Sequence, residues 1–266
     1  MSGWNPEHYL QYADERGRPF VELVARVGAE APARVVDLGC GPGNLTRLLC
    51  TRWPQADVVG VDSSAAMVER AQAAHTEAEH TGGRLTFRHQ DLRDWLTDAE
   101  TADKRVDVLV SNATLQWLPD HLDLLPRLLD RTTWLAVQVP GNFDEPSHTL
   151  RAELAAEPAY AAHLADVAVP SSHAPAVYLD LLAEAGAQVD AWETTYLHVL
   201  TGPDPVFTWV SATGARPTIE ALPDGLRERF VAEYRRRLAQ AYPERHGRVV
   251  LPFRRVFMVA RRGPAA

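Results

Sequence analysis

Short apolar runs rich in β-branched residues alternate with amphipathic stretches in the first half of the chain. The apolar runs lie at residues 33–38, 56–62, 84–89, 106–111 and 133–140. Apolar positions with helical spacing lie between them, at residues 44–53, 63–75 and 120–130. Strands that alternate with helices in this way are typical of a parallel sheet covered by helices on both faces. The pattern therefore predicts an α/β protein with a doubly wound, mostly parallel sheet.

Two longer runs in the second half of the chain also have the alternation of strands. They lie at residues 187–200 and 249–262. We expect the second of them at an edge of the sheet, because Pro252 has no N–H group to donate to a neighbouring strand. With these two strands the sheet should have seven.

Helical segments inserted between the late strands are expected to form a cap over the carboxyl ends of the sheet. They lie at about residues 145–175 and 202–247, and the second should contain two helices before residue 242. Residues 1 to about 30 form a further segment that we expect to close over the same end as a lid. The whole chain, residues 1–266, is interpreted as one domain with these additions.

The turn after the first strand carries three glycines at alternate positions. In the sequence VVDLGCGPGNLTRLL, Asp37 is followed by Gly39, Gly41 and Gly43. A glycine-rich turn that joins a first strand to a helix is where an open α/β sheet accepts a nucleotide. The dinucleotide pattern G-x-G-x-x-G would place its third glycine where this chain has Asn44. A carboxylate beside the turn repels a pyrophosphate and suits a ligand with a cationic amino-acid end.

Charge and composition narrow the class of partner. The chain has 27 Lys and Arg residues against 35 Asp and Glu residues, a net charge of −8. A nucleic-acid partner is not expected, because a large nucleic-acid footprint needs a basic face. A membrane partner is not expected either, since no apolar run approaches the length of a membrane span and the N-terminus lacks the features of a secretory signal. Cys40 and Cys50 have no zinc-site spacing, so we expect no metal and a cytoplasmic location.

The glycine turn resembles the first motif of the class I S-adenosylmethionine-dependent methyltransferases. Polar residues also follow the next strands, with Asp62 in VVGVD, Asp91 in RHQDLRDW and Asn112 in SNATLQWL. The resemblance implies a Rossmann-like fold and S-adenosyl-L-methionine as the cofactor, with Asp62 on the ribose hydroxyls and Asp91 beside the adenine amino group. The cofactor-binding residues that it implies are Asp37, Gly39, Gly41, Gly43, Asp62, Ser63, Asp91, Leu92 and Asn112.

Longer segments resemble the trans-aconitate 2-methyltransferase family in particular. These segments include SNATLQWLPDH, the QVP-N---P-H arrangement at residues 138–148 and WVSATGARP at residues 209–217. SNATLQWLPDH and ATGARP are the most specific pieces, because generic cofactor binding does not require them. The family transfers a methyl group to a carboxylate of trans-aconitate and forms a monomethyl ester. The resemblance implies the same activity for this chain.

This reaction makes modest demands on the catalytic residues. A carboxylate is already ionised at neutral pH, so no general base is expected and catalysis becomes a matter of orientation. A tricarboxylate does need hydrogen-bond donors and arginine forks. The candidates for the substrate pocket are Trp4, Tyr9, Gln116, Trp117, Tyr196, Arg216, Arg254 and Arg255. We expect Arg216 in particular to hold a carboxylate that is not methylated, because it lies in the ATGARP signature.

Three other interpretations stay open at the level of the sequence. The main one keeps the fold and the cofactor and changes the small-molecule acceptor to another polycarboxylate or to a specialised metabolite. A nicotinamide oxidoreductase is disfavoured by Asp37 and Asn44. A non-catalytic cofactor-binding protein is disfavoured because the motifs are intact. The sequence makes no prediction of the oligomeric state or of which carboxylate is methylated.

Overall fold

The computed structural model describes residues 17–76, 84–98 and 105–263. Trp4 and Tyr9 lie outside these residues, as does most of the segment predicted to be a lid. In the described part of the chain the strands are β1 (Arg34–Leu38), β2 (Asp57–Asp62), β3 (Leu85–His89), β4 (Val106–Asn112), β5 (Thr132–Pro140), β6 (Ala187–Leu200) and β7 (Val249–Arg262).

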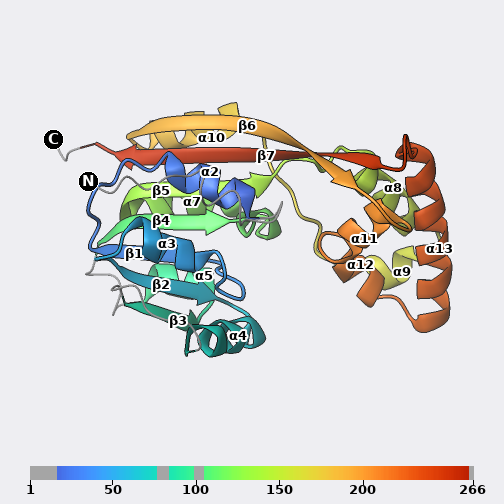
Figure 1. Cartoon of the computed structure of the whole chain (residues 1–266), viewed down its shortest axis with the longest axis horizontal. Helices are drawn as coiled ribbons and strands as arrows, with labels where there is room; N and C mark the ends of the chain where they lie inside the picture. The colour runs from blue at the N-terminus through green and yellow to red at the C-terminus, as the bar shows by residue number, and fades with distance from the viewer. Residues whose placement is uncertain (1–16, 77–83, 99–104, 264–266) are drawn as a thin grey trace. The chain divides into compact units, whose positions relative to one another are not determined.

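The helices fall into two groups along the chain (Figure 1). Those of the first group are α2 (Arg18–Ala25), α3 (Thr46–Arg52), α4 (Ala65–Thr76), α5 (Leu92–Thr97), the short 3-10 helix η1 (Leu115–Trp117) and α7 (His121–Asp130). The later helices are α8 (Pro146–Ala155), α9 (Ala161–Leu164), α10 (Pro175–Glu184), α11 (Pro205–Ser211), α12 (Arg216–Glu220) and α13 (Asp224–Ala241).

The chain divides into two compact units. Unit 1 consists of residues 1–139, 173–193 and 256–266, and unit 2 consists of residues 140–172 and 194–255. The two helical segments predicted from the sequence as a cap fall largely within unit 2. Their role as a cap, like that of the N-terminal segment as a lid, stays a prediction.

Within the described residues, seven strands form one sheet in the order β3-β2-β1-β4-β5-β7-β6. The pairs β1–β2, β1–β4, β2–β3 and β4–β5 are parallel, and the arrow of β7 in Figure 1 points against that of β5. The registers bring aliphatic side chains together, since Val36 is opposite Val59 on one side and Leu109 on the other. The predicted fold class, an α/β protein with a mostly parallel seven-stranded sheet, is confirmed.

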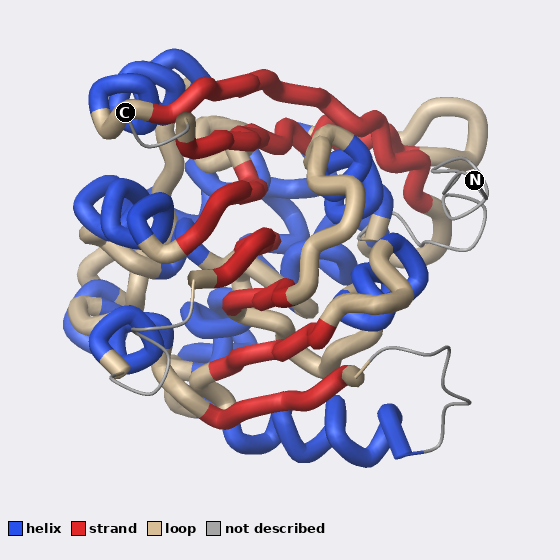
Figure 2. The backbone as a smooth tube through the Cα atoms, turned by 90° about the vertical axis from the view of Figure 1, so that its left-hand side faces the viewer, coloured by secondary structure: helices blue, strands red, loops and turns tan. Residues whose placement is uncertain are grey.

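Helices cover both faces of the sheet in unit 1, as Figure 2 shows for the stacked strands. On one face, α5, α7 and α10 pack with the strands into one hydrophobic cluster that includes Trp95, Leu125, Leu182 and Leu109. Helices α2, α3 and α4 lie on the other face (Figure 1). This burial explains the continuous apolar runs of β1 and β4, whose residues meet side chains on both faces.

Unit 2 has a hydrophobic core of its own. Its helices α8, α11, α12 and α13 pack with the unit 2 part of β7 around aromatic side chains, among them Phe230 and Tyr234, both less than 1% exposed. The hydroxyl of Tyr234 donates to the carbonyl oxygen of Ser147. Side-chain hydrogen bonds therefore fix the first turn of α8 on the core of this unit.

Two predictions about the late elements are wrong. Residues 202–242 contain three helices rather than two, since the five-residue α12 is too short to produce a periodic pattern. Strand β7 lies between β5 and β6, and β6 is the edge strand at that end of the sheet. Strand β5 ends at Pro140, and the N–H of Gly141 still donates to the carbonyl oxygen of Arg254, two residues beyond Pro252 on β7, so Pro252 lies past the end of β5.

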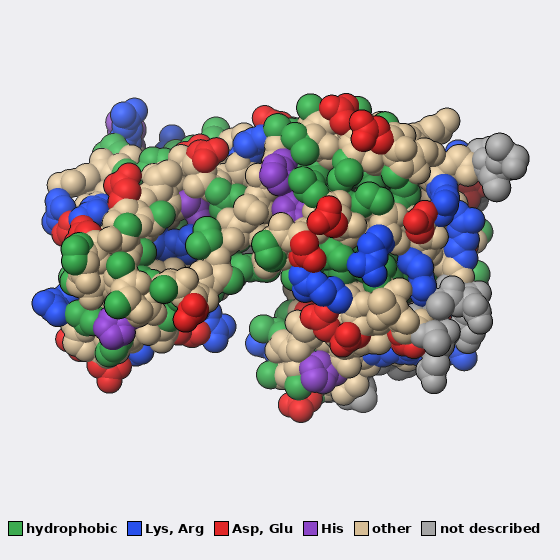
Figure 3. Space-filling view, turned by 180° about the vertical axis from the view of Figure 1, so that it is seen from behind, with side chains coloured by type: hydrophobic (Ala, Val, Ile, Leu, Met, Phe, Trp, Pro, Cys, Tyr) green, Lys and Arg blue, Asp and Glu red, His purple; other side chains and the backbone are tan. Residues whose placement is uncertain are grey.

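The surface of the described residues carries charges of both signs. On the face that Figure 3 shows, their acidic and basic side chains are interspersed rather than gathered into one basic area. None of the helices in the described ranges is both long and apolar enough to cross a membrane.

Candidate functional site

The glycine turn between β1 and α3 is built from left-handed backbone. Gly39, Gly41 and Gly43 have φ angles of +78°, +55° and +76°. The turn is tied to the end of β2, because the N–H groups of Gly39 and Cys40 both donate to the carbonyl oxygen of Val61, at 2.7 and 3.1 Å. Side chains other than hydrogen are strained in this conformation, which accounts for glycine at every second position.

The three glycines differ in what surrounds them. A Cβ on Gly39 would lie 2.0 Å from Oγ1 of Thr114, and a Cβ on Gly43 would lie 2.6 Å from the ring of Phe87. Around Gly41 no heavy atom of the described residues lies within 4 Å of such a Cβ. The outer two glycines are thus required by the packing of the protein itself, whereas Gly41 faces open space in which a ligand can approach the backbone.

Asp37 is a buried acid at the end of β1. Its side chain is 3% exposed, and its Oδ2 accepts a 2.7 Å hydrogen bond from the hydroxyl of Thr46 on α3. Burial raises the pKa of Asp37 to about 7, against the lowering effect of the Thr46 hydroxyl, and the nearby Asp62 adds to the rise. Within the described ranges no lysine or arginine pairs with this carboxylate, so a cationic ligand group would compensate its charge.

Asp62 connects the glycine turn to the start of α4. One carboxylate oxygen accepts the N–H of Gly41 at 2.8 Å, and the other accepts the N–H of Ser64 at 2.9 Å. Each oxygen keeps a further lone pair for a ligand hydroxyl. The sequence reasoning predicted that Asp62 accepts hydrogen bonds from the cofactor's ribose, and it missed that Asp62 also holds Gly41 in place.

The other predicted cofactor residues lie at the ends of β2, β3 and β4. Asp91 caps α5, with Oδ1 accepting the N–H of Arg93 at 2.8 Å, and Leu92 is buried as the first residue of that helix. Ser63 is exposed after β2, and its carbonyl oxygen is 3.0 Å from Nε2 of His89. Asn112 ends β4, and its buried Oδ1 has no hydrogen-bond partner among the described residues.

The segment after β4 brings Gln116 and Trp117 into the same unit. Ala113 has a φ angle of +55°, which bends the chain sharply into η1. Gln116 is 5% exposed, and its Nε2 donates to the carbonyl oxygen of Ala113 at 2.6 Å, whereas its Oε1 has no partner within the described ranges. Buried amide oxygens without partners are unusual and indicate a ligand or water at that position.

These residues fit a cofactor with a cationic amino-acid end, a ribose and a base. Because the carboxyl ends of parallel strands meet at one edge of a sheet, the ends of β1, β2, β3 and β4 collect Asp37, Asp62, Asp91 and Asn112 there. The carboxylates of this set can accept hydrogen bonds from an ammonium group and from hydroxyls, and the main chain at Gly41 is open to a ligand. The buried carboxylate of Asp37 beside the turn disfavours a pyrophosphate, and this is what separates the site from a dinucleotide site.

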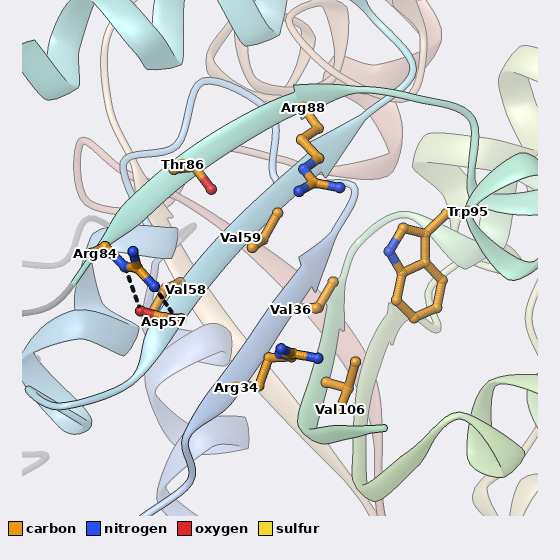
Figure 4. Close-up of a pocket in the computed structure, with 10 residues that line it drawn as sticks. All are labelled: Arg34, Val36, Asp57, Val58, Val59, Arg84, Thr86, Arg88, Trp95 and Val106. Carbon is orange, nitrogen blue, oxygen red and sulfur yellow. Dashed lines mark hydrogen bonds and ion pairs between the residues drawn. The ribbon is translucent and has the colours of Figure 1, made fainter. Parts of the chain in front are cut away.

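A separate pocket of about 310 Å³ lies along the sheet in unit 1 (Figure 4). It is lined by residues at or near the amino ends of β1, β2 and β3, including Arg34, Asp57 and Arg84, and by Trp95. Arg84 and Asp57 form an ion pair of 2.8 Å there. None of the described cofactor candidates lines this pocket, so it is distinct from the site at the carboxyl ends.

Of the predicted substrate residues, Tyr196, Arg254 and Arg255 lie in unit 2. Tyr196 is 4% exposed on β6. Arg254 donates to the carbonyl oxygen of Gly141 at 3.0 Å, and Arg255 is buried with its guanidinium 4.4 Å from the centre of the Phe253 ring. Their contact with a substrate stays a prediction.

Arg216 is the first residue of α12 rather than part of an open turn. Its Nε lies 2.7 Å from Oε1 of Glu220, and the two side chains are 59% and 62% exposed. An exposed pair of this kind contributes little to stability. The guanidinium therefore has a partner in this structure, and its binding to a substrate carboxylate stays a prediction.

One functional candidate was missed by the sequence reasoning. Arg151 on α8 is 8% exposed and has no acidic partner within the described ranges, and its Nη1 donates to the carbonyl oxygen of Gly214. The sequence carried a partial signal, since the QVP-N---P-H arrangement ends three residues before Arg151 and Gly214 lies in ATGARP. Neither segment alone indicated that the two meet.

Comparison with known proteins gives both a family and a fold. Residues 35–132 match the family described as "Methyltransferase domain". The chain is 48% identical to trans-aconitate 2-methyltransferase of Streptomyces avermitilis, over 98% of this chain and 97% of that protein. It is 49% identical to the enzyme of the same name from Mycobacterium sp., over 98% of this chain and 100% of that protein.

Solved structures of low sequence identity share the fold. A cyclopropane synthase from Mycobacterium tuberculosis matches with a TM-score of 0.55 and 13% identity, over 91% of this chain and 83% of that chain. Magnesium protoporphyrin IX methyltransferase from Synechocystis matches with a TM-score of 0.52 and 16% identity, over 98% and 89%. The relatives of high identity extend through both units, whereas the domain match lies within unit 1.

Proposed function

The chain belongs to the trans-aconitate 2-methyltransferase family, and from this membership we propose that it is a carboxyl O-methyltransferase that converts trans-aconitate into its monomethyl ester. S-adenosyl-L-methionine, when bound, supplies an electrophilic methyl group on a sulfonium. The observation that carries the proposal is the extent of the identity, which covers 98% of the chain and includes unit 2. Cofactor binding alone would not require likeness in that unit.

The residues of unit 1 are suited to holding the cofactor. Asp37 would pair with its ammonium group, and Asp62 would accept hydrogen bonds from the ribose hydroxyls through its free lone pairs. Asp91 would accept from the adenine amino group, and the open space at Gly41 would let the cofactor approach the main chain. The turn needs no rearrangement for this, because Asp62 already fixes Gly41.

The chain needs to orient the acceptor and exclude water rather than move a proton. A carboxylate of pKa about 4 is ionised at neutral pH, and its oxygen is a sufficient nucleophile for an activated methyl group. Holding the two reactants in line removes much of the entropic part of the barrier. His121 is 1% exposed and lies 2.9 and 3.0 Å from Leu118 O and Tyr178 Oη, as expected of a structural histidine.

The direct test is incubation with methyl-labelled S-adenosylmethionine and a panel of di- and tricarboxylates. Mass spectrometry of the products should show one labelled methyl group on trans-aconitate, and base hydrolysis should release it as methanol because it is an ester. If only a different acid is labelled, that acid is the acceptor, and the use of S-adenosylmethionine as methyl donor still stands. No labelled product from any acid would overturn the proposal.

A further inference from the structure

Arg151 is a buried cation without a compensating anion. It is 8% exposed on α8, and the contact that satisfies it is neutral, a hydrogen bond from Nη1 to the carbonyl oxygen of Gly214. No aspartate or glutamate among the residues that the structure describes forms an ion pair with it. A guanidinium taken out of water in this way is unfavourable unless an anion joins it. The arrangement is therefore complete only when a negatively charged group is bound.

His148 meets the same glycine from one turn earlier on α8. A Cβ on Gly214 would lie 3.2 Å from Cε1 of His148, so the imidazole ring lies against the bare α-carbon of this glycine. Nδ1 of His148 is buried and has no hydrogen-bond partner among the described residues. Burial and the charge of Arg151 lower the pKa of His148 to about 4. The ring is neutral near pH 7, so it offers hydrogen bonding and leaves Arg151 as the one charge of the pair.

Asn142 adds two further unpartnered polar atoms just before α8. The residue is 2% exposed, and neither Oδ1 nor Nδ2 has a hydrogen-bond partner in the described part of unit 2. Its carbonyl oxygen accepts the N–H of Glu145 at 3.1 Å, which holds the turn that leads into the helix. Buried amides are nearly always satisfied, so two unpartnered polar atoms on one side chain indicate a group that hydrogen-bonds to a ligand.

The scaffold under these side chains is rigid. The N–H of Ser147 donates to the hydroxyl of Tyr242 at 3.0 Å, and the hydroxyl of Tyr234 donates to the carbonyl oxygen of Ser147. Both tyrosines are buried in the core of unit 2. A first turn fixed in this way holds Arg151 and His148 at a constant separation, as recognition of a small anion requires.

We propose that Arg151, His148 and Asn142 bind a carboxylate of the substrate that is not methylated. This inference rests on the proposed function, since it assigns a subsite to the same tricarboxylate. A carboxylate matches the planar fork of an arginine and supplies the single negative charge that Arg151 lacks. The subsite also explains why the QVP-N---P-H and ATGARP segments occur together, because they meet at Gly214.

The test variant is Arg151→Gln, in which glutamine keeps a donor for the Gly214 carbonyl and removes the charge. Arg229→Gln is the matched control, because Arg229 is an exposed arginine of the same unit. We expect Arg151→Gln to lower kcat/KM on trans-aconitate by about 30-fold or more, mainly through KM. The affinity for S-adenosylmethionine should stay near that of the control variant, and the melting temperature of the free protein should equal or exceed that of the control, because the variant removes a buried charge.

Analogues that lack one carboxylate each give a readout that a structural role would not produce. Itaconate, cis-glutaconate and 2-methylfumarate each omit a different carboxylate of trans-aconitate. Calorimetric titration of the four acids into the S-adenosylhomocysteine complexes of wild type and Arg151→Gln should show a large loss for trans-aconitate. For one analogue the two proteins should bind within about threefold of each other, because that analogue lacks the group that Arg151 holds.

The outcomes separate this inference from the proposed function. Equal losses for all four acids, or no loss at all, would overturn the subsite and leave the methylation result unaffected. Arg151-dependent binding of trans-aconitate without methylation would support the subsite and overturn the proposed function. If wild type neither binds nor methylates trans-aconitate, both are wrong.

Discussion

The hydroxyl of Thr46 donates a 2.7 Å hydrogen bond to Oδ2 of Asp37, and within the described residues this carboxylate has no cationic partner. Arg151 in unit 2 is the converse case, a buried guanidinium without an acidic partner in the described chain. Each residue is unfavourable in the free protein and favourable with a ligand of opposite charge. Uncompensated buried charges of this kind are typical of binding sites.

Asp37→Asn should remove a pH dependence from the stability of the cofactor-free protein. The pKa of Asp37 is about 7 in the folded state and about 3.8 in an unfolded chain, so the folded state binds the proton more tightly. Asp37 therefore destabilises the fold increasingly as the pH rises from about 4 to about 7, by about 1.4 kcal/mol per pH unit, and no further above that range.

Urea unfolding of wild type and Asp37→Asn at several pH values measures this difference. The stability of wild type relative to the variant should fall between about pH 5 and about pH 7 and then level off. Parallel curves for the two proteins would show that the carboxylate does not titrate in this range.

Alanine substitutions at Gly39 and Gly41 should separate stability from binding. Gly39→Ala combines a positive φ angle with a Cβ 2.0 Å from Thr114, so it should cost about 3 kcal/mol or more of folding free energy. Gly41→Ala meets open space and should cost about 1–2 kcal/mol, from backbone strain alone. Denaturant unfolding checks the order, and calorimetry should show that Gly41→Ala weakens S-adenosylmethionine binding. A Gly41→Ala protein with wild-type affinity would place the cofactor elsewhere.

Asp62→Ala should affect the turn and the cofactor together. It leaves the N–H groups of Gly41 and Ser64 without their acceptors and removes the carboxylate oxygens that would accept hydrogen bonds from the ribose hydroxyls. We expect the affinity for S-adenosylmethionine to fall by several kcal/mol, since each hydrogen bond to a charged group contributes about 1.5–3 kcal/mol. Calorimetric titration of the folded variant gives this number. Unchanged affinity would limit Asp62 to holding the turn.

Arg216→Ala should have almost no effect on folding. Its ion pair with Glu220 is exposed, and pairs of this kind contribute about 0–1 kcal/mol. The sequence-based prediction is that the variant nevertheless loses activity on trans-aconitate while its cofactor affinity stays near wild type. Steady-state kinetics beside a melting scan tests this, with Glu220→Gln as the control that frees the guanidinium. Full activity of Arg216→Ala on trans-aconitate would show that Arg216 does not contact the substrate.

The sheet was predictable to within about a residue because β1 to β5 are short apolar runs separated by helices, and β6 and β7 show strand alternation over 14 residues each. The acids at the strand ends followed from the same logic, since parallel strands place their carboxyl ends together. The five-residue α12 and the internal position of β7 were missed. The first has too few residues to show a period, and the second depends on where β5 stops.

The substrate residues were harder to predict for a physical reason. Arg151 lies in α8, whose sequence has no clear apolar face, so no local feature distinguishes it from a surface arginine. Its burial depends on Gly214, which lies 63 residues further along the chain. The unpartnered polar atoms of His148 and Asn142 became visible only once the hydrogen bonds of the described residues were accounted for.

The chain passes four times between the two units, after residues 139, 172, 193 and 255, and three of these passages run inside β5, β6 and β7. Unit 2 is therefore not a detachable module that ends at a linker. A chimera that borrows acceptor preference from a relative would need two grafts, residues 140–172 and 194–255, made in the same step. Recombination at a single point would join half of one anion subsite to half of another, because Arg151 and Gly214 lie on different grafts. Acceptor preference in this fold should thus diversify by point substitution more readily than by exchange of segments.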